Sequence, residues 1–172
     1  KKLNNMKILI LGGNGMIGHK MYQIISNKYP NTWVLFKKKF NDIKKHDFFK
    51  KNKIIDNFDL SNFDDLIILL NNLNPDIIIN AAAHVGSIAY VTNYAGDVVR
   101  DNSLMYLNLY EAIRQTNSNI IVINPISNCS YPLFSKILIH SKIEAYLSAT
   151  VIVFNVEGVL LYIWSPIADK LL

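Results

Sequence analysis

A glycine-rich segment near the start of the chain has the composition and spacing of a phosphate-binding turn. Gly12-Gly13-Asn14-Gly15-Met16-Ile17-Gly18 follows an apolar run and precedes apolar residues at helical spacing. Gly12 would permit a tight turn, Gly15 a close approach of a pyrophosphate, and Gly18 close packing of helix against strand. Backbone N–H groups and the positive end of the helix dipole would then face the phosphates. We therefore expect a dinucleotide to be bound by Gly12, Asn14, Gly15, Met16, Ile17 and Gly18; an ordinary glycine-containing turn is the alternative.

Lysines follow the second apolar run, where the ribose of such a dinucleotide would lie. Phe36 precedes Lys37, Lys38 and Lys39, and the nearest acid is Asp42. An acid at this place would bind the ribose 2′-hydroxyl of NAD, whereas lysines can hold a 2′-phosphate as point charges. The sequence therefore favours NADP over NAD, with Lys37 in the site. The alternative is a solvated lysine run in a chain rich in lysine and asparagine.

The elements that would position these residues alternate between strand and helix. Residues 7–11 form a short apolar strand, 16–27 a helix closed by Pro30, and 33–36 a second strand, which makes a βαβ unit. Further strands are expected at 54–60, 77–83 and 119–124, and helices at 64–73 and 97–115, with a lysine-rich loop at 37–53. This alternation predicts an α/β protein with a Rossmann-type, doubly wound parallel sheet. After Pro132 the alternation stops, although 151–154 and 159–163 could each be strands.

Composition restricts the class of protein and of partner. The chain has 172 residues, of which 51% are hydrophobic and 18% charged, so a globular domain is expected rather than disorder. The single cysteine and the lack of a long apolar run predict a cytoplasmic protein without disulfides or membrane segments. The net charge is +5 and is concentrated at 37–53. No zinc-ligand spacing or aromatic-interleaved basic motif accompanies it, so we expect neither a metal nor nucleic acid.

The motifs together resemble the extended short-chain dehydrogenase/reductase superfamily, in its NAD-dependent epimerase/dehydratase group. The resemblance rests on Gly12-x-x-Gly15-x-x-Gly18, Asp59-Leu60 and Asn80-Ala81-Ala82-Ala83. Within that group, the GDP-L-fucose synthases and their close relatives carry similar segments. These correspond here to His84-Val85-Gly86-Ser87-Ile88, Asp101-Asn102 and Ser127-Asn128-Cys129-Ser130-Tyr131-Pro132. The likeness extends from about Met6 to Pro132.

The resemblance implies roles for individual residues. Asp59 and Leu60 would frame the adenine, and Ala81, Ala82 and Ala83 would line the cofactor cleft. His84 would pack beside the nicotinamide, and Asn102 would belong to the cofactor site. Ser127 would bind the keto oxygen of the substrate, and Cys129 would be the acid/base in epimerisation. A cleft thiol can take and return a proton, although a lone cysteine is often only a small buried hydrophobe.

By the same resemblance the substrate would be a GDP-linked 4-keto-6-deoxyhexose. The enzyme would epimerise this sugar and then reduce it with NADPH, and a homodimer is the assembly that the resemblance suggests. The superfamily's Tyr-x-x-x-Lys is not found, because Tyr131, Tyr146 and Tyr162 are not followed by lysine at that spacing. We expect residues 1–132 to form the NAD(P)-binding domain and 133–172 a divergent or truncated tail, with the substrate domain largely missing.

Two explanations of this tail stay open, a decayed or truncated relative and a frameshift in the gene after Pro132. Either one predicts cofactor binding with little or no catalysis, because the proton donor for hydride transfer is lost. The alternatives are another NAD-dependent sugar-nucleotide epimerase, a dTDP-4-dehydrorhamnose reductase, or a non-catalytic nucleotide-binding fragment.

Overall fold

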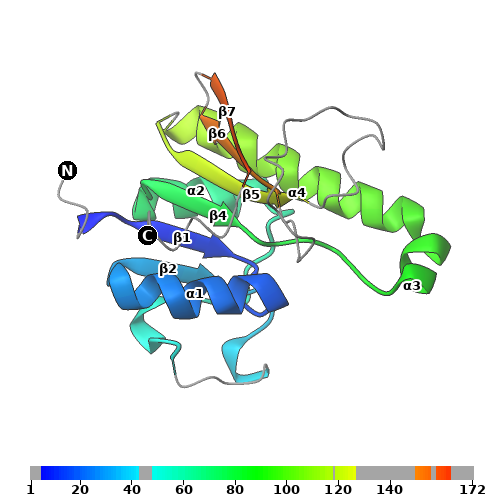
Figure 1. Ribbon diagram of the computed structural model, residues 1–172, viewed down its shortest axis with the longest axis horizontal. Coiled ribbons are helices and arrows are strands. Elements are labelled where there is room, and N and C mark those ends of the chain that lie inside the picture. Colours follow the sequence, from blue (N-terminus) through cyan, green and yellow to red (C-terminus); the bar gives the residue numbers. More distant parts are fainter. Residues whose placement is uncertain (1–4, 43–47, 118, 127–149, 156–157, 164–172) are drawn as a thin grey trace, which may run out of the picture.

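The computed structural model describes residues 5–42, 48–117, 119–126, 150–155 and 158–163, which build one sheet with helices on both faces (Figure 1). The sheet has seven strands in the order β3-β2-β1-β4-β5-β6-β7. The strands are β1 Ile8–Leu11, β2 Thr32–Leu35, β3 Ile54–Ile55, β4 Ile77–Asn80, β5 Ile121–Ile126, β6 Thr150–Asn155 and β7 Gly158–Ile163. The helices are α1 Met16–Lys28, α2 Phe63–Leu73, α3 Ile88–Asn93 and α4 Ala95–Thr116, with 3-10 turns η2 Phe40–Asp42 and η3 Lys51–Lys53.

The core of the sheet is parallel and buried on both faces. Ile8 of β1 pairs with Thr32 of β2 on one side and with Ile77 of β4 on the other. All four residues of β1 are buried, as expected for a central parallel strand covered by helices on both faces. The parallel Rossmann-type sheet predicted from the sequence is confirmed for β3, β2, β1, β4 and β5.

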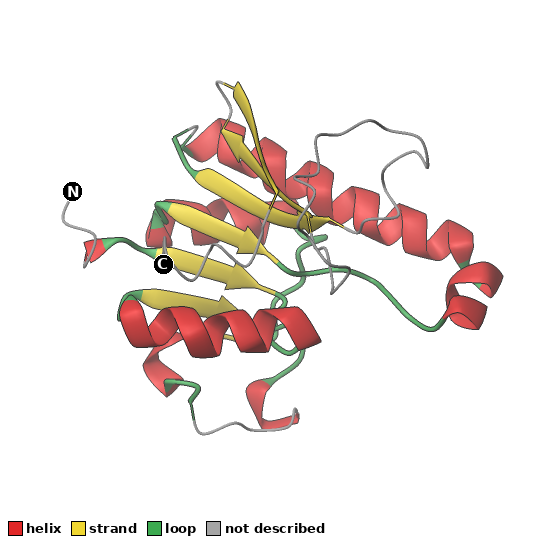
Figure 2. Ribbon diagram, in the orientation of Figure 1, coloured by secondary structure: helices red, strands yellow, loops and turns green. Residues whose placement is uncertain are grey.

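Side chains of β1 alternate between two apolar clusters, because successive residues of a strand point to opposite faces. Ile8 and Ile10 join the cluster that includes Tyr22 of α1. Leu9 and Leu11 join the other, which is built with α2 and α4 through leucines such as Leu66, Leu70 and Leu109. The figures show the same division, with α1 on one side of the sheet and α2 and α4 on the other (Figure 2).

The connection from β2 to β3 contains no α-helix among its described residues. Instead, an aromatic cluster covers that part of the sheet: Phe49 packs edge-on against Phe36 at 5.1 Å and lies 5.2 Å from the ring of Tyr22. The buried Phe36 and Phe49 thus replace the apolar face that a crossover helix would supply. Among the described residues of this connection, Lys37, Lys38, Lys39, Lys50 and Lys51 are exposed.

The order of the strands places a crevice at the carboxyl ends of the neighbouring strands β1 and β4. The chain runs outward from β1 to β2 and β3, and then crosses back so that β4 pairs with the other side of β1. Loops leaving β1 and β4 therefore diverge to opposite faces. In open α/β sheets ligands bind outside the carboxyl ends of the strands at such a reversal.

Several elements differ from the sequence-based expectation. The third strand is only Ile54–Ile55, because Asn57 has a left-handed backbone (φ 55°) that interrupts the extended chain. The strand expected at 77–83 ends at Asn80, where its partner β1 also ends at Leu11. The sequence did not predict the short helix α3, which is too brief to show a periodic apolar face.

The hairpin of β6 and β7 extends the sheet beyond β5. The sequence indicated strands at 151–154 and 159–163, and both are present, but β6 runs antiparallel to β5 and β7 antiparallel to β6. Asn155 pairs with Gly158 at the hairpin end. Within the described helices, none is both long enough and apolar enough to cross a bilayer.

A buried polar chain joins the sheet to α4 beneath the crevice. The side chain of Asn80 donates to the side-chain oxygen of Asn124 at 3.0 Å, and Asn124 donates to the hydroxyl of Tyr110 at 2.5 Å. Burial raises the pKa of Tyr110, so its hydroxyl stays protonated at neutral pH. Asn80 and Asn124 are 5% and 1% exposed, so their side-chain amides form these hydrogen bonds in place of bonds to water.

We expect Asn124→Ala to lower the free energy of unfolding by about 1–3 kcal/mol, because it removes the oxygen that accepts a hydrogen bond from the buried side chain of Asn80. Equilibrium unfolding in urea measures this loss. Asn72→Ala on the exposed face of α2 is the matched control, and we expect it to stay within about 0.5 kcal/mol of the wild type. Equal stability of the two variants would contradict the structural role of the buried chain.

Candidate functional site

The glycine loop leaves the end of β1 and lies against the residues that follow β4 before it enters α1. Gly12 has φ +75°, and a Cβ there would lie 2.7 Å from the carbonyl oxygen of Ala81 and 2.7 Å from the nitrogen of Ala82. The N–H of Gly13 donates to the carbonyl of Leu35 at 2.9 Å, which ties the loop to β2. Glycine at position 12 is therefore required by both the backbone angle and the space.

Gly18 and Gly15 have different surroundings within the same loop. A Cβ on Gly18 would lie 2.2 Å from the carbonyl oxygen of Gly12, so this glycine lets α1 pack against the loop. Gly15 has ordinary angles (φ −75°, ψ 161°), and its Cβ would meet only the Gly12 oxygen at 3.2 Å. Packing within the chain thus explains Gly12 and Gly18, whereas Gly15 borders open space.

The N-terminus of α1 faces this open space without a side-chain cap. Gly15 is the N-cap residue, no side chain in the described ranges bonds the first amides, and the first turn holds no acid. The positive end of the helix dipole and the first N–H groups are consequently available to an anion. The carbonyl of Gly15 is itself bonded by His19, 2.9 Å from Nδ1.

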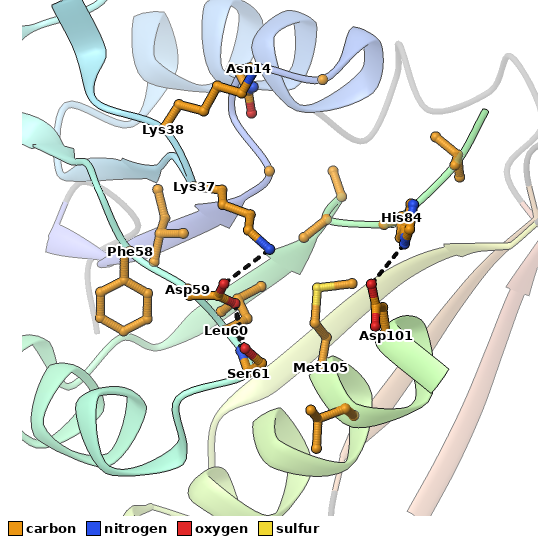
Figure 3. A pocket seen from close by; sticks show the side chains of 18 residues that line it. Asn14, Lys37, Lys38, Phe58, Asp59, Leu60, Ser61, His84, Asp101 and Met105 are labelled. Carbon is orange, nitrogen blue, oxygen red and sulfur yellow. Dashed lines mark hydrogen bonds and ion pairs between the residues drawn. The ribbon is translucent and has the colours of Figure 1, made fainter. Parts of the chain in front are cut away.

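An ion pair lies at one end of the crevice, where the ends of β2 and β3 meet. Lys37 Nζ is 3.0 Å from a carboxylate oxygen of Asp59 (Figure 3). Asp59 also accepts hydrogen bonds from the N–H and the hydroxyl of Ser61, at 2.9 and 2.7 Å. Partial burial alone would raise the pKa of Asp59, but the bonds from Ser61 and Lys37 outweigh it and hold that pKa below its usual range.

At the other end of the crevice, the loop after β4 is fastened to α4. The side chain of Asn102 accepts from the N–H of His84 at 2.8 Å and donates to its carbonyl at 2.9 Å, as a neighbouring strand would. The His84 ring nitrogen Nδ1 lies 2.9 Å from a carboxylate oxygen of Asp101. Bonds from Arg100 and His84 hold the pKa of Asp101 below its usual range, against a smaller effect of desolvation.

These parts line a pocket of about 490 Å³, with the ion pair at one end and His84 at the other (Figure 3). The pocket brings together most of the residues predicted from the sequence to bind a cofactor, namely Gly12, Asn14, Gly15, Lys37, Asp59, Leu60, Ala81, Ala82 and Ala83. Met16, Ile17, Gly18 and Asn102 do not line it. Met16 is 82% exposed at the start of α1, Gly18 supports the loop, and Asn102 acts through the backbone of His84.

The predicted substrate-side residues Ser127 and Cys129 lie outside the described residues. Lys38, from the lysine run that favoured NADP, lines the pocket as well. Its other lining residues were not singled out for it from the sequence: Leu35, Phe58, Ser61, Val85, Asp101, Leu104 and Met105. Leu104 and Met105 lie on a helix predicted only as amphipathic, and nothing local distinguishes them from core residues. Ser61 could have been found, because serine two residues after an aspartate often bonds that carboxylate in a turn.

Comparison with known proteins decides the family. The profile described as the NAD dependent epimerase/dehydratase family matches residues 8–151. The chain belongs to the NAD-dependent epimerase/dehydratase family. The matched range begins at β1 and contains the glycine loop and the whole pocket. No curated protein matches the chain.

Solved structures resemble this family member over its Rossmann fold. An epimerase from Methanothermobacter thermautotrophicus has a TM-score of 0.63 and 18% identity, over 81% of this chain and 40% of that one. The UDP-Glc/GlcNAc 4-epimerase from Campylobacter jejuni has a TM-score of 0.54 and 26% identity, over 65% and 34%. A Thermus thermophilus UDP-glucose 4-epimerase in complex with NAD has a TM-score of 0.52 and 24% identity, over 64% of this chain and 34% of that one. The chain thus spans well under half the length of these enzymes.

The residues of the pocket fit the dinucleotide that the family name implies. Gly15 leaves the approach to the helix N-terminus open, and the uncapped amides there suit a pyrophosphate. The pocket has polar groups at both ends, and the apolar side chain of Met105 lies between Asp59 and His84 (Figure 3). No group of three or more metal-ligating side chains occurs within the described ranges.

Proposed function

We propose that the chain binds NADP, and NAD more weakly, in the pocket between the glycine loop and the loop after β4. The observation that carries this proposal is the convergence of three separate segments on one pocket. These segments are the glycine loop, Asp59-Leu60 after β3, and Ala81–Ala83 after β4. The glycine loop was assigned to a cofactor from its residues and the other two segments by the family resemblance, and segments so far apart in sequence need not meet.

The pocket residues would divide the dinucleotide between them. The loop from Gly12 to Gly15 and the N-terminus of α1 would hold the pyrophosphate, and Asp59 and Leu60 would hold the adenosine. Lys37 and Lys38, which both line this end, would attract a 2′-phosphate. The nicotinamide would then lie toward His84, where, when bound in reduced form, it supplies a hydride.

The substrate we propose is a nucleotide-linked sugar, and more narrowly a GDP-linked 4-keto-6-deoxyhexose. Two of the similar structures are named UDP-sugar 4-epimerases, which supports the class of substrate. The narrower proposal rests on the resemblance of residues 127–132 to the GDP-L-fucose synthases, with Ser127 at the keto oxygen and Cys129 as acid/base. Two further predictions concern the domain and the assembly. Limited proteolysis would test whether residues 1–132 form the cofactor domain, and sedimentation would test whether the chain forms a homodimer.

We expect Lys37→Met to weaken NADPH binding by about three- to tenfold and to leave NADH binding unchanged. The ammonium would pair with the 2′-phosphate that only NADPH carries, and the contact is modest because Lys37 is 69% exposed and shared with Asp59. Fluorescence titration of both dinucleotides measures the difference. Lys51→Met in η3, outside the pocket, is the control for lost positive charge. Equal weakening of NADH and NADPH by Lys37→Met would contradict the proposed contact.

A further inference from the structure

We propose that Asp59 limits the selectivity of the pocket for NADP over NAD, because it is the counterion of Lys37 and competes with the 2′-phosphate for that ammonium. The inference deepens the proposed function and rests on it. In the free chain Lys37 pairs with Asp59, and binding of NADP transfers the ammonium from the carboxylate to the phosphate. Binding of NAD, which has a hydroxyl at this position, leaves the pair intact.

The fold supplies an acid at a place where the local sequence has only lysines. An acid beside the ribose is what turns a site of this kind toward NAD. The strand β3 pairs with β2, and beyond its end the N–H of Phe58 donates to the carbonyl of Phe36 at 3.1 Å. This bond brings the next residues of both segments together, so that Asp59 lies 3.0 Å from Lys37 Nζ. A lysine that could bind a 2′-phosphate therefore already has a negative partner.

Ser61 holds the carboxylate of Asp59 with one oxygen directed at Lys37. The N–H and the hydroxyl of Ser61 both bond Oδ1, at 2.9 and 2.7 Å, whereas Oδ2 lies 3.0 Å from Lys37 Nζ. Burial would raise the pKa of Asp59, but the bonds from Ser61 and Lys37 outweigh it and keep the pKa low. The carboxylate is consequently charged at neutral pH. The negative partner of Lys37 is thus in place before a ligand binds.

Lys38 lines the same pocket but differs from Lys37 in its surroundings. Its side chain points away from Asp59 (Figure 3). Among the residues that the structure describes, no carboxylate lies within ion-pair distance of the Lys38 ammonium. Only Lys37 has to leave a carboxylate in order to bind a phosphate. A change at Asp59 should therefore act through Lys37 and not through Lys38.

The exposure of the Lys37–Asp59 pair sets the size of its effect. The two side chains are 69% and 42% exposed, and ion pairs so accessible to water are weak. A phosphate monoester carries a charge of about −1.5 to −2 at neutral pH, which is more than the single charge of the carboxylate. The ammonium therefore moves to the phosphate when NADP binds. Breaking the pair lowers the affinity for NADP by a factor of about two to five.

The affinities of four forms of the full chain for NADPH and NADH test this competition. Fluorescence titration compares the wild type, Asp59→Asn, Lys37→Met and the double variant. Asparagine keeps the oxygen that accepts from Ser61 and removes the charge. We expect Asp59→Asn to raise the preference for NADPH over NADH about two- to fivefold, and to leave it unchanged when Lys37→Met is also present. The ratio of the two affinities cancels any change in contacts with the adenosine, which both dinucleotides share.

Two further variants control for position and for net charge. In a Lys38→Met background, Asp59→Asn should keep its full effect on the ratio. Asp64→Asn, at the exposed start of α2 and outside the pocket, removes one negative charge and should leave the ratio at its wild-type value. An unchanged ratio in Asp59→Asn, or an equal gain with and without Lys37, would overturn the inference while dinucleotide binding stands. A folded chain that binds neither dinucleotide would remove the proposed function as well.

Carbon NMR of lysines that carry isotope-labelled methyl groups follows the ammonium itself. The Lys37 signal, assigned by its loss in Lys37→Met, should shift when NADPH is added and stay in place when NADH is added. In the free chain, Asp59→Asn should shift the same signal. Lys51, in η3 and outside the pocket, should give one signal throughout. A Lys37 signal that Asp59→Asn leaves in place would show that the pair does not form, and would overturn the inference whether or not a dinucleotide binds.

Discussion

We expect Gly12→Ala to lower the free energy of unfolding by about 2–5 kcal/mol, because both the backbone angle and the space at this position exclude a side chain. A left-handed backbone costs a non-glycine residue about 1–3 kcal/mol. The new methyl would also lie 2.7 Å from backbone atoms of Ala81 and Ala82, which cannot move away as a side chain could. Overpacking of this kind adds about 1–3 kcal/mol. Urea unfolding followed by circular dichroism measures the sum.

Gly96→Ala provides the matched control, because a Cβ on Gly96 would meet nothing within 4 Å. Gly96 lies in α4, where alanine favours the helix by about 0.5–1 kcal/mol over glycine. The same chemical change should therefore destabilise the chain at Gly12 and stabilise it slightly at Gly96. If the two variants shift the urea midpoint equally, the loop does not have the geometry described.

We expect Gly15→Asp to abolish tight NADPH binding, by at least about 100-fold, while leaving the fold intact. Position 15 has ordinary backbone angles, and aspartate is a favoured N-cap residue. The carboxylate would bond the free amides of α1 and gain from the helix dipole, so stability should be unchanged or higher. That same carboxylate would stand where the pyrophosphate binds, and two negative charges about 4 Å apart repel by about 4 kcal/mol near a protein surface.

Fluorescence titration with NADPH, together with urea unfolding, measures the two opposite effects of Gly15→Asp. Lys20→Gln on the same helix changes the net charge by the same amount and lies outside the pocket. We expect it to alter NADPH affinity only slightly. Unchanged affinity in Gly15→Asp would place the phosphates elsewhere.

Local features of the chain could be predicted because their causes are local. Spacing alone shows that Gly12, Gly15 and Gly18 form a turn between strand and helix, and apolar runs show the buried strands. The lysine run after the second strand assigned Lys37 to a cofactor site, and the family resemblance assigned Asp59 to that site. Neither could show that the two residues form an ion pair, because residues 22 apart meet only when β2 and β3 pair.

The features that were missed depend on the tertiary arrangement. Short α3 has no apolar periodicity, and its start is marked only by Ser87, which is also an ordinary loop residue. Tyr90 and Asp101 come together at His84 because α3 and the start of α4 fold back along the loop after β4. Asn102 was assigned to the cofactor, yet its amide binds the backbone of His84, a role that spacing cannot distinguish from ligand binding.

Binding of NADPH to the full chain tests the central claim most directly. Isothermal titration calorimetry of the folded protein should show one saturable site for NADPH, a weaker one for NADH, and competition between the two for the same site. Competition would show that both dinucleotides occupy the same site. A folded chain that binds neither dinucleotide would contradict the account.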